Sequence, residues 1–370
     1  MVDGSRASTL AATPAEMRTA HRGYINSQKA DTQMHNSLNK GTETISTETP
    51  VHEARIMREV RDFSRPILRQ SLGQIATSFG GFIAVCSLMY FSLQLSYWIT
   101  LALAPMAAGF LVRIFIIQHD CGHASFFRSK TANEIVGRLS SLLTLTPYEN
   151  WRRQHAGHHR TWNDLDRRAN GLDIYSTCLT VAEYKALTPF KRRWYRLTRH
   201  PLVANILLPP VVFLLLFRVP FDAPKSWQRE RRGVYLTDLG LAMGIVGLGW
   251  AIGFGPLVAV QLPVMILASI IGVWLFSVQH RFEGVRWMRH DQWRFGTAAL
   301  QGSSYLRLPP ILRWFTGNIG FHHVHHLSPR VPNYRLQECH KRIESLYGVP
   351  RISLRDAILA VRFALWDENS

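Results

Sequence analysis

Nine of the sixteen histidines in this chain fall in three short windows. In the first window, residues 119–123, two histidines are four residues apart. In the other two, residues 155–159 and 322–326, three histidines follow the spacing i, i+3, i+4. On a helix these spacings place the imidazole rings on one face, where they can converge on an ion. The windows therefore indicate a metal centre with many ligands. The candidates are His119, His123, His155, His158, His159, His322, His325 and His326.

His280 is a ninth candidate ligand. It follows Gln279 at the end of an apolar run, just as His119 follows Gln118 at the end of another. An interfacial histidine without a metal is the alternative interpretation. Nine imidazoles exceed what one tetrahedral zinc ion needs and suit two metal ions of higher coordination, and imidazole donors alone suit iron, copper or zinc. His323 points away from the i, i+3, i+4 face of its window and is not among the predicted ligands.

Three acidic residues lie close to the histidine windows: Asp120, Asp164 and Asp166. We predict that they accept hydrogen bonds from ring N–H groups and so orient the imidazoles. Surface ion pairs are the alternative. The string His-Glu-x-x-His, in which the glutamate is the base of a metalloprotease, is absent from the sequence.

Two long apolar runs must position these histidines. Residues 71–112 and 239–279 contain no Asp, Glu, Lys or Arg. As a helix, each run would be roughly 60 Å long, about twice the hydrocarbon core of a bilayer. Tyr97 and Trp98 in the first run, and Gly253 and Pro256 in the second, mark the reversals. We predict two helical hairpins, with spans at 71–93, 96–117, 235–254 and 257–279.

A third apolar segment, residues 201–217, is shorter and is broken by Pro209 and Pro210. If it crossed the membrane, His280 would emerge on the opposite side from His119 and the windows could not converge. We therefore predict that this segment is interfacial or re-entrant. The predicted fold is an all-α membrane protein with four transmembrane helices, capped by a cytoplasmic helical domain of residues 118–200 and 280–370 that holds the metal centre.

Charge and composition bound the possible partners. The net charge of +18 is concentrated beside the apolar runs, for example at Arg65, Arg69, Arg229 and Arg231, which is the positive-inside pattern. No nucleic-acid-binding module is recognisable, so we expect the basic face to meet lipid and acidic soluble proteins. The four cysteines have no paired spacing, which favours a reducing compartment. Residues 1–60 are predicted to be a disordered polar tail, and Met57 is a candidate natural start; residues 61–370 form the membrane domain.

The strings around the three windows resemble the membrane fatty-acid desaturase family, specifically its bacterial acyl-lipid branch with delta-12-like enzymes. The resemblance spans nearly everything after about residue 60, and three histidine boxes in this order are a specific signal. Thr161, Trp162 and Asn163 stand where relatives often have small residues, which could alter the surface nearby. The matching strings are at residues 119–127, 151–159, 163–167, 299–305, 317–329 and 331–334.

The resemblance implies a di-iron centre that uses O2 as co-substrate and two electrons to introduce a double bond into an acyl chain of a membrane lipid. The family's ligand positions map onto the eight histidines of the three boxes, and His280 matches an additional histidine of relatives. It also implies an integral protein of the bacterial inner membrane whose active site faces the cytoplasm. The sequence contains no glycine fingerprint for a dinucleotide and no haem-attachment motif, so electrons are expected from an acidic carrier such as ferredoxin.

Two other functions are compatible with histidine boxes. Di-iron hydroxylases and ketolases share the metal and the reductant, but the Asp-Cys-Gly at 120–122 and the Leu-Gln-Gly-Ser-Ser block at 300–304 favour a desaturase. A histidine-rich metal transporter would place ionisable ligands within its spans. Here every box lies at or beyond the end of an apolar run, which favours a catalytic site that caps the membrane helices.

Overall fold

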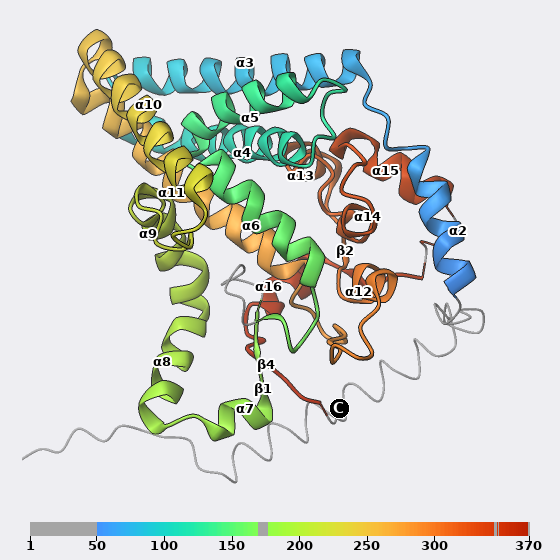
Figure 1. The fold of residues 1–370 in the computed structure, drawn as a ribbon. Coiled ribbons are helices and arrows are strands. Elements are labelled where there is room, and N and C mark those ends of the chain that lie inside the picture. The colour runs from blue at the N-terminus through green and yellow to red at the C-terminus, as the bar shows by residue number, and fades with distance from the viewer. Residues whose placement is uncertain (1–49, 169–176, 344–345, 347, 369–370) are drawn as a thin grey trace, which may run out of the picture. The chain divides into compact units, whose positions relative to one another are not determined.

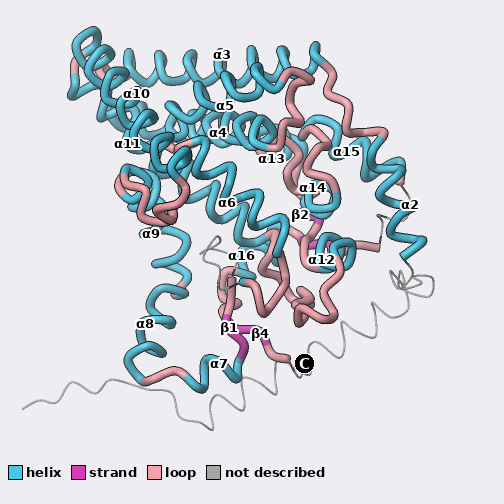
Figure 2. The backbone as a smooth tube through the Cα atoms, viewed as in Figure 1, coloured by secondary structure: helices cyan, strands magenta, loops and turns pink. Residues whose placement is uncertain are grey.

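The computed structural model describes residues 50–168, 177–343, 346 and 348–368. Helices dominate this part of the chain, and the loops gather around the short helices that follow the last long one (Figure 2). Four strands of two residues form two parallel pairs: β1 (Leu179–Thr180) with β4 (Leu365–Trp366), and β2 (Tyr305–Leu306) with β3 (Arg351–Ile352).

Within the described residues, four helices are long and apolar enough to cross a membrane: α3 (Leu68–Ser92), α4 (Tyr97–Gly122), α10 (Gln228–Ile252) and α11 (Phe254–Val278). The predicted all-α membrane fold with two hairpins is confirmed. Ser96 caps α4 by accepting a hydrogen bond from the backbone of Trp98. Gly253 joins α10 to α11 with φ of +91°, a conformation that favours glycine.

Helix α4 occupies the centre of the membrane part and packs against α3, α5 (Lys130–Thr144) and α11 (Figure 1). It continues to Gly122, past the predicted end of the span at 117, so that it carries His119 on the same rigid element. Helix α10 starts at Gln228, before the predicted position 235, and packs against α6 (Tyr148–Thr161), which carries the second box. The long helices therefore extend into the cap and hold the boxes.

The third apolar segment is bent. Helix α8 (Pro189–Arg199) meets the helical stretch Val203–Arg218 at 57°, and this stretch consists of a π-helix (Val203–Leu207), α9 (Leu208–Leu214) and a 3-10 turn (Leu216–Arg218). Helix α9 packs against α11. Length and composition allow either a broken fifth span or a re-entrant element. The interfacial or re-entrant placement of 201–217 therefore stays a prediction.

The remaining described helices are short; α12 to α16 gather near the ends of α4, α6 and α11, whereas α7 lies beside β1 and β4 (Figure 1). The third box forms a helix of its own, α14, which packs against α12 and α15. These helices are α7 (Val181–Ala186), α12 (Phe295–Gln301), α13 (Pro310–Phe315), α14 (His322–Leu327), α15 (Asn333–Arg342) and α16 (Leu354–Ala360).

The structure corrects the end of the predicted tail. Residues 50–61 form helix α2 (Pro50–Arg61), and its Ile56 and Val60, four residues apart, are buried in one cluster with Phe321 and Leu336. Each of these two side chains contributes about 1.5–3 kcal/mol by leaving water. The polar composition of the segment hid this single apolar face. The rest of the predicted tail, residues 1–49, lies outside the described residues.

Candidate metal centre

The structure brings all nine predicted histidines together at the ends of α4, α6 and α11 and on α14. In the first histidine group, the potential ligand nitrogens all lie within 4.8 Å of one another; its members are His119, His123, His155, His159 and His325. The second histidine group meets the same limit with His158, His280 and His326. His322 lies beside the second group, with its Nε2 atom 2.9 Å from Nε2 of His280. Eight of the nine side chains are buried and His123 is half-buried.

The distances within each group fit ligands that share one metal ion. In the first group, Nε2 of His325 lies 3.0 Å from Nε2 of His119 and 2.9 Å from that of His159. In the second, Nε2 of His158 lies 3.1 Å from that of His280 and 3.3 Å from that of His326. Two imidazole nitrogens bound at right angles to one ion, each at about 2.1 Å, would be about 3 Å apart. The donor sets therefore fit two metal ions.

Hydrogen bonding among the rings cannot account for this packing. Nε2 of His280 lies within 3.1 Å of three other Nε2 atoms, those of His158, His322 and His326, and a neutral imidazole has a single N–H to donate. Nε2 of His123 is buried without a hydrogen-bond partner in the described part of the chain. A buried polar atom without a partner is costly, whereas a bound cation would satisfy these lone pairs together.

Electrostatics keeps the rings ready to bind a cation. Burial has the largest effect on the ring pKa values, and the neighbouring histidines have the next largest. Both disfavour the protonated ring and so lower its pKa. As a result, six of the ring pKa values lie well below the ordinary value for histidine, so these imidazoles are neutral at pH 7 and carry a free lone pair. These six residues are His123, His155, His159, His322, His325 and His326.

Two rings are oriented through their second nitrogen. Nδ1 of His119 donates to Oδ1 of Asp120 over 3.1 Å, and Nδ1 of His280 donates to the carbonyl of Gly302 over 3.3 Å. With Nδ1 holding the proton, Nε2 is left as the ligand atom. The Gly302 carbonyl also accepts the Trp162 indole N–H at 2.7 Å. The 300–304 block thus contacts the centre through a backbone carbonyl.

Asp120, which accepts from the His119 ring, is itself held in place by Asn333. Its Oδ2 accepts from the backbone N–H of Asn333 at 2.7 Å and from the Asn333 side chain at 2.8 Å. The side-chain oxygen Oδ1 of Asn333 in turn accepts a hydrogen bond from Nε2 of Gln74 on α3 at 3.0 Å. All three side chains are buried. This buried network links a membrane helix, box one and the start of α15.

The other two acidic residues have different partners from those predicted. Oδ2 of Asp164 accepts from Nδ1 of His290 at 2.7 Å, and its Oδ1 accepts from the backbone N–H of Asp166 and Arg167. Asp166 accepts from Arg289 and from the backbone of His290. The predicted orienting roles of Asp164 and Asp166 toward the boxes are therefore corrected: both hold the loop around His290, which follows the last span by some ten residues.

Three aromatic side chains that the sequence analysis did not assign support the histidines. Trp151 stacks on His155 with ring centroids 4.7 Å apart, and Phe276 lies 5.6 Å from His280. Each precedes its histidine by four residues, within α6 for Trp151 and across the end of α11 for Phe276, a spacing that could have identified it. The ring centroids of Trp162 and His280 are 3.9 Å apart and Trp162 is buried, so this side chain packs against the histidines and does not form part of the surface.

His323, which the spacing placed off the ligand face, lies outside both groups. Its Nε2 is 3.0 Å from Nδ1 of His340, and both rings are buried. Successive side chains on helix α14 are 100° apart, so His322, His325 and His326 share one face and His323 points in another direction.

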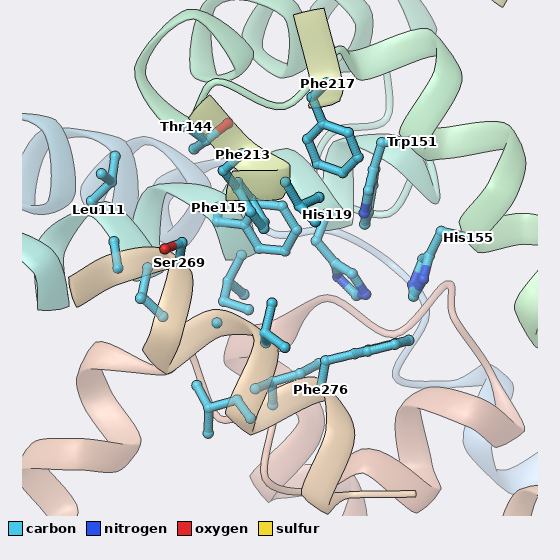
Figure 3. A pocket seen from close by; sticks show the side chains of 18 of the residues that line it. Leu111, Phe115, His119, Thr144, Trp151, His155, Phe213, Phe217, Ser269 and Phe276 are labelled. Atoms are coloured by element: carbon cyan, nitrogen blue, oxygen red, sulfur yellow. The ribbon is translucent and has the colours of Figure 1, made fainter. Parts of the chain in front are cut away.

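An apolar cavity leads from between the membrane helices to the histidines. Its walls come from α4, α9 and α11, and the rings of His119, His155, His158 and His322 line it where it meets both groups. Figure 3 shows Leu111 and Ser269 at one end and His119 and His155 at the other. Phe213 and Phe217, from the segment predicted to be interfacial, form part of the wall. Apolar lining residues include Leu111, Val112, Phe115, Ile116, Val212, Phe213, Phe217, Met265, Val273 and Phe276.

The fold and the site together define a protein with four helices that fit membrane spans and a cluster of box histidines, able to hold metal, at the end of an apolar cavity. The sequence model described as "Fatty acid desaturase" matches residues 96–355, which include all nine histidines. A protein of Bacillus subtilis named fatty acid desaturase is 42% identical over 327 residues, covering 88% of this chain and 92% of the relative. The chain belongs to the fatty acid desaturase family and is an oxidoreductase.

More distant relatives have names that specify a lipid substrate. A Synechocystis protein named sn-1 acyl-lipid omega-3 desaturase (ferredoxin) is 27% identical over 311 residues, covering 78% of each chain. A protein of Anabaena variabilis named sn-1 oleoyl-lipid 12-desaturase is 24% identical over 291 residues, covering 72% of this chain and 75% of the relative. The family therefore includes acyl-lipid desaturases of cyanobacteria.

Proposed function

We propose that this protein is an acyl-lipid desaturase that uses dioxygen and two iron ions to introduce a cis double bond into an acyl chain of a membrane lipid. The eight histidines of the two groups, together with His322, are the nine proposed ligands. The observation that carries the proposal is the apolar cavity, because it ends at rings of both histidine groups. A hydrocarbon chain is the ligand that such walls favour.

The reaction balances with an external donor. Two hydrogens leave adjacent carbons of the acyl chain with two electrons, two further electrons and two protons come from the donor and water, and dioxygen becomes two water molecules. Iron bound by the imidazoles would supply the activation of dioxygen that an unactivated C–H bond requires. The neutral, buried histidines fit iron binding, since none of the six with lowered pKa must lose a proton at pH 7.

The cavity walls have two tasks in this reaction. Aromatic rings such as Phe115 and Phe276 exclude water beside the histidines, which protects the centre from side reactions. The walls that α4 and α11 contribute restrict the acyl chain to few conformations, so that chosen carbons are held near the reacting site. The position of the acyl chain depends on apolar contacts along its whole length. Wall residues far from the histidines therefore affect which carbons react.

We propose that electrons come from an acidic carrier of the ferredoxin type and that the histidines face the cytoplasm of a bacterial inner membrane. The net charge of +18 and the ferredoxin in the name of the Synechocystis relative support the carrier. The basic residues beside the spans, including Arg65, Arg69 and Arg229, support the orientation.

Expression in a host with a simple lipid profile tests the proposal. We expect new cis-unsaturated fatty acids in the membrane lipids, detected and located by mass spectrometry. His158→Ala should abolish the product at an unchanged protein level, because His158 lies in the second group and also lines the cavity. An unchanged product from the variant would contradict the proposed centre, and hydroxylated or ketone products in place of alkenes would contradict desaturation.

A further inference from the structure

Gly272 is the smallest residue on the α11 wall of the cavity. On this helix Met265, Ser269, Gly272 and Phe276 line the cavity at the spacing i, i+4, i+7, i+11, which is one face. Along the helix Gly272 lies about 10 Å after Met265 and about 9 Å before Val278, the last residue of α11 and two residues short of His280. It therefore lies near the middle of the cavity, between the end that meets the histidines and the opposite end.

Close helix packing does not explain this glycine. Small residues in membrane helices commonly let two helices approach, and Gly109 is such a case, because a Cβ atom there would lie 2.9 Å from the Phe315 ring. A Cβ atom at Gly272 would meet no heavy atom within 4 Å. Other glycines with equally open surroundings, such as Gly80 and Gly244, lie on exposed faces of α3 and α10, whereas Gly272 faces the cavity.

The missing side chain at Gly272 therefore leaves free space inside the cavity. We propose that Gly272 is a specificity-determining residue that lets an acyl chain extend past the middle of the cavity, and that this space sets the longest chain the protein accepts. This inference rests on the proposed acyl substrate. A larger side chain would narrow the cavity between the histidines and Met265, so a long chain would no longer fit in the extended form while a short one would.

Gly272→Leu and the control Gly244→Leu test this inference. Both place the same side chain on a membrane helix at a position where a Cβ atom meets nothing within 4 Å, but only Gly272 lines the cavity. Each variant, as the full chain, is expressed in a host supplied with myristoyl and stearoyl chains, and the unsaturated products are compared by mass spectrometry. Iron content is measured on the same preparations as a readout independent of turnover.

We expect Gly272→Leu to lower the ratio of stearoyl to myristoyl products about tenfold to a hundredfold, as overpacking of a well-fitted cavity would. Iron content should not change, and Gly244→Leu should keep the wild-type ratio. Gly272→Ala should lower the same product ratio by a smaller factor. If the Gly272→Leu protein does not accumulate in the host, the ratio measured for Gly272→Ala tests the inference. An unchanged ratio, or an equal shift in the control, overturns the inference. A wild-type protein that forms no unsaturated product overturns the proposed function instead.

Discussion

Replacing Asp120 by asparagine should weaken iron binding without unfolding the protein. The carboxylate joins His119, over 3.1 Å, to two donors of Asn333 at 2.7 and 2.8 Å. An asparagine has the same shape but only one side-chain oxygen. Its NH2 group would face either the His119 N–H or the two N–H donors of Asn333, so one of these residues loses its acceptor. It also removes the charge that strengthens these hydrogen bonds.

The expected size of the effect is that of other residues that hydrogen-bond to a metal-ligating histidine. Their loss lowers metal affinity about tenfold to a hundredfold. That range corresponds to about 1.4–2.7 kcal/mol. The assay is a titration of the purified protein with an iron chelator, in which the chelator concentration that removes half of the iron should fall by the same factor. Thermal unfolding of the metal-free forms separates this effect from a general loss of stability.

Asp166→Asn provides the matched control. The two aspartates were equivalent in the sequence analysis, but Asp166 is exposed and accepts hydrogen bonds from Arg289 and from the backbone of His290. Its replacement should leave the chelator midpoint unchanged. Equal midpoints for Asp120→Asn and the wild type, or an equal decrease in Asp166→Asn, would refute the reasoning.

Further predictions concern a histidine outside the groups, the topology and the electron donor. His323→Gln should keep the wild-type iron content, because His323 contacts His340 and lies outside both groups; loss of iron in this variant would contradict the ligand assignment. A cysteine in place of Lys225, which is exposed after the bent segment, should react with a membrane-impermeant reagent only from the cytoplasmic side; labelling from the periplasm alone would exclude the re-entrant placement. Turnover with an acidic ferredoxin below saturation should fall about tenfold or more between low and physiological ionic strength, and a salt-independent rate would contradict an acidic carrier.

The sequence was sufficient to predict the four membrane helices and the convergence of the histidines. Uncharged runs of twice the membrane thickness leave few arrangements other than hairpins, and ligand spacing on a helix fixes which rings share a face. His280 was identifiable because Gln279-His280 repeats the Gln118-His119 pattern at a second helix exit. These predictions depend on local periodicity, which a single sequence contains.

The features that the sequence analysis missed depend on contacts between distant segments. Asp164 and His290 are far apart in sequence, so nothing near Asp164 indicated that its partner was His290 and not a box histidine. The bent segment contributes Phe213 and Phe217 to the cavity through packing of α9 on α11, which its apolar composition alone does not imply. In α2 the apolar face consists of few residues within a polar stretch, too weak a pattern to distinguish from a tail.

The metal content of the purified wild-type protein tests the central claim most directly. The two histidine groups and His322 predict about two iron ions per chain, measured by elemental analysis after purification under conditions that retain iron. A protein that binds a single metal ion per chain, or that retains zinc in place of iron while desaturating lipid, would contradict the account.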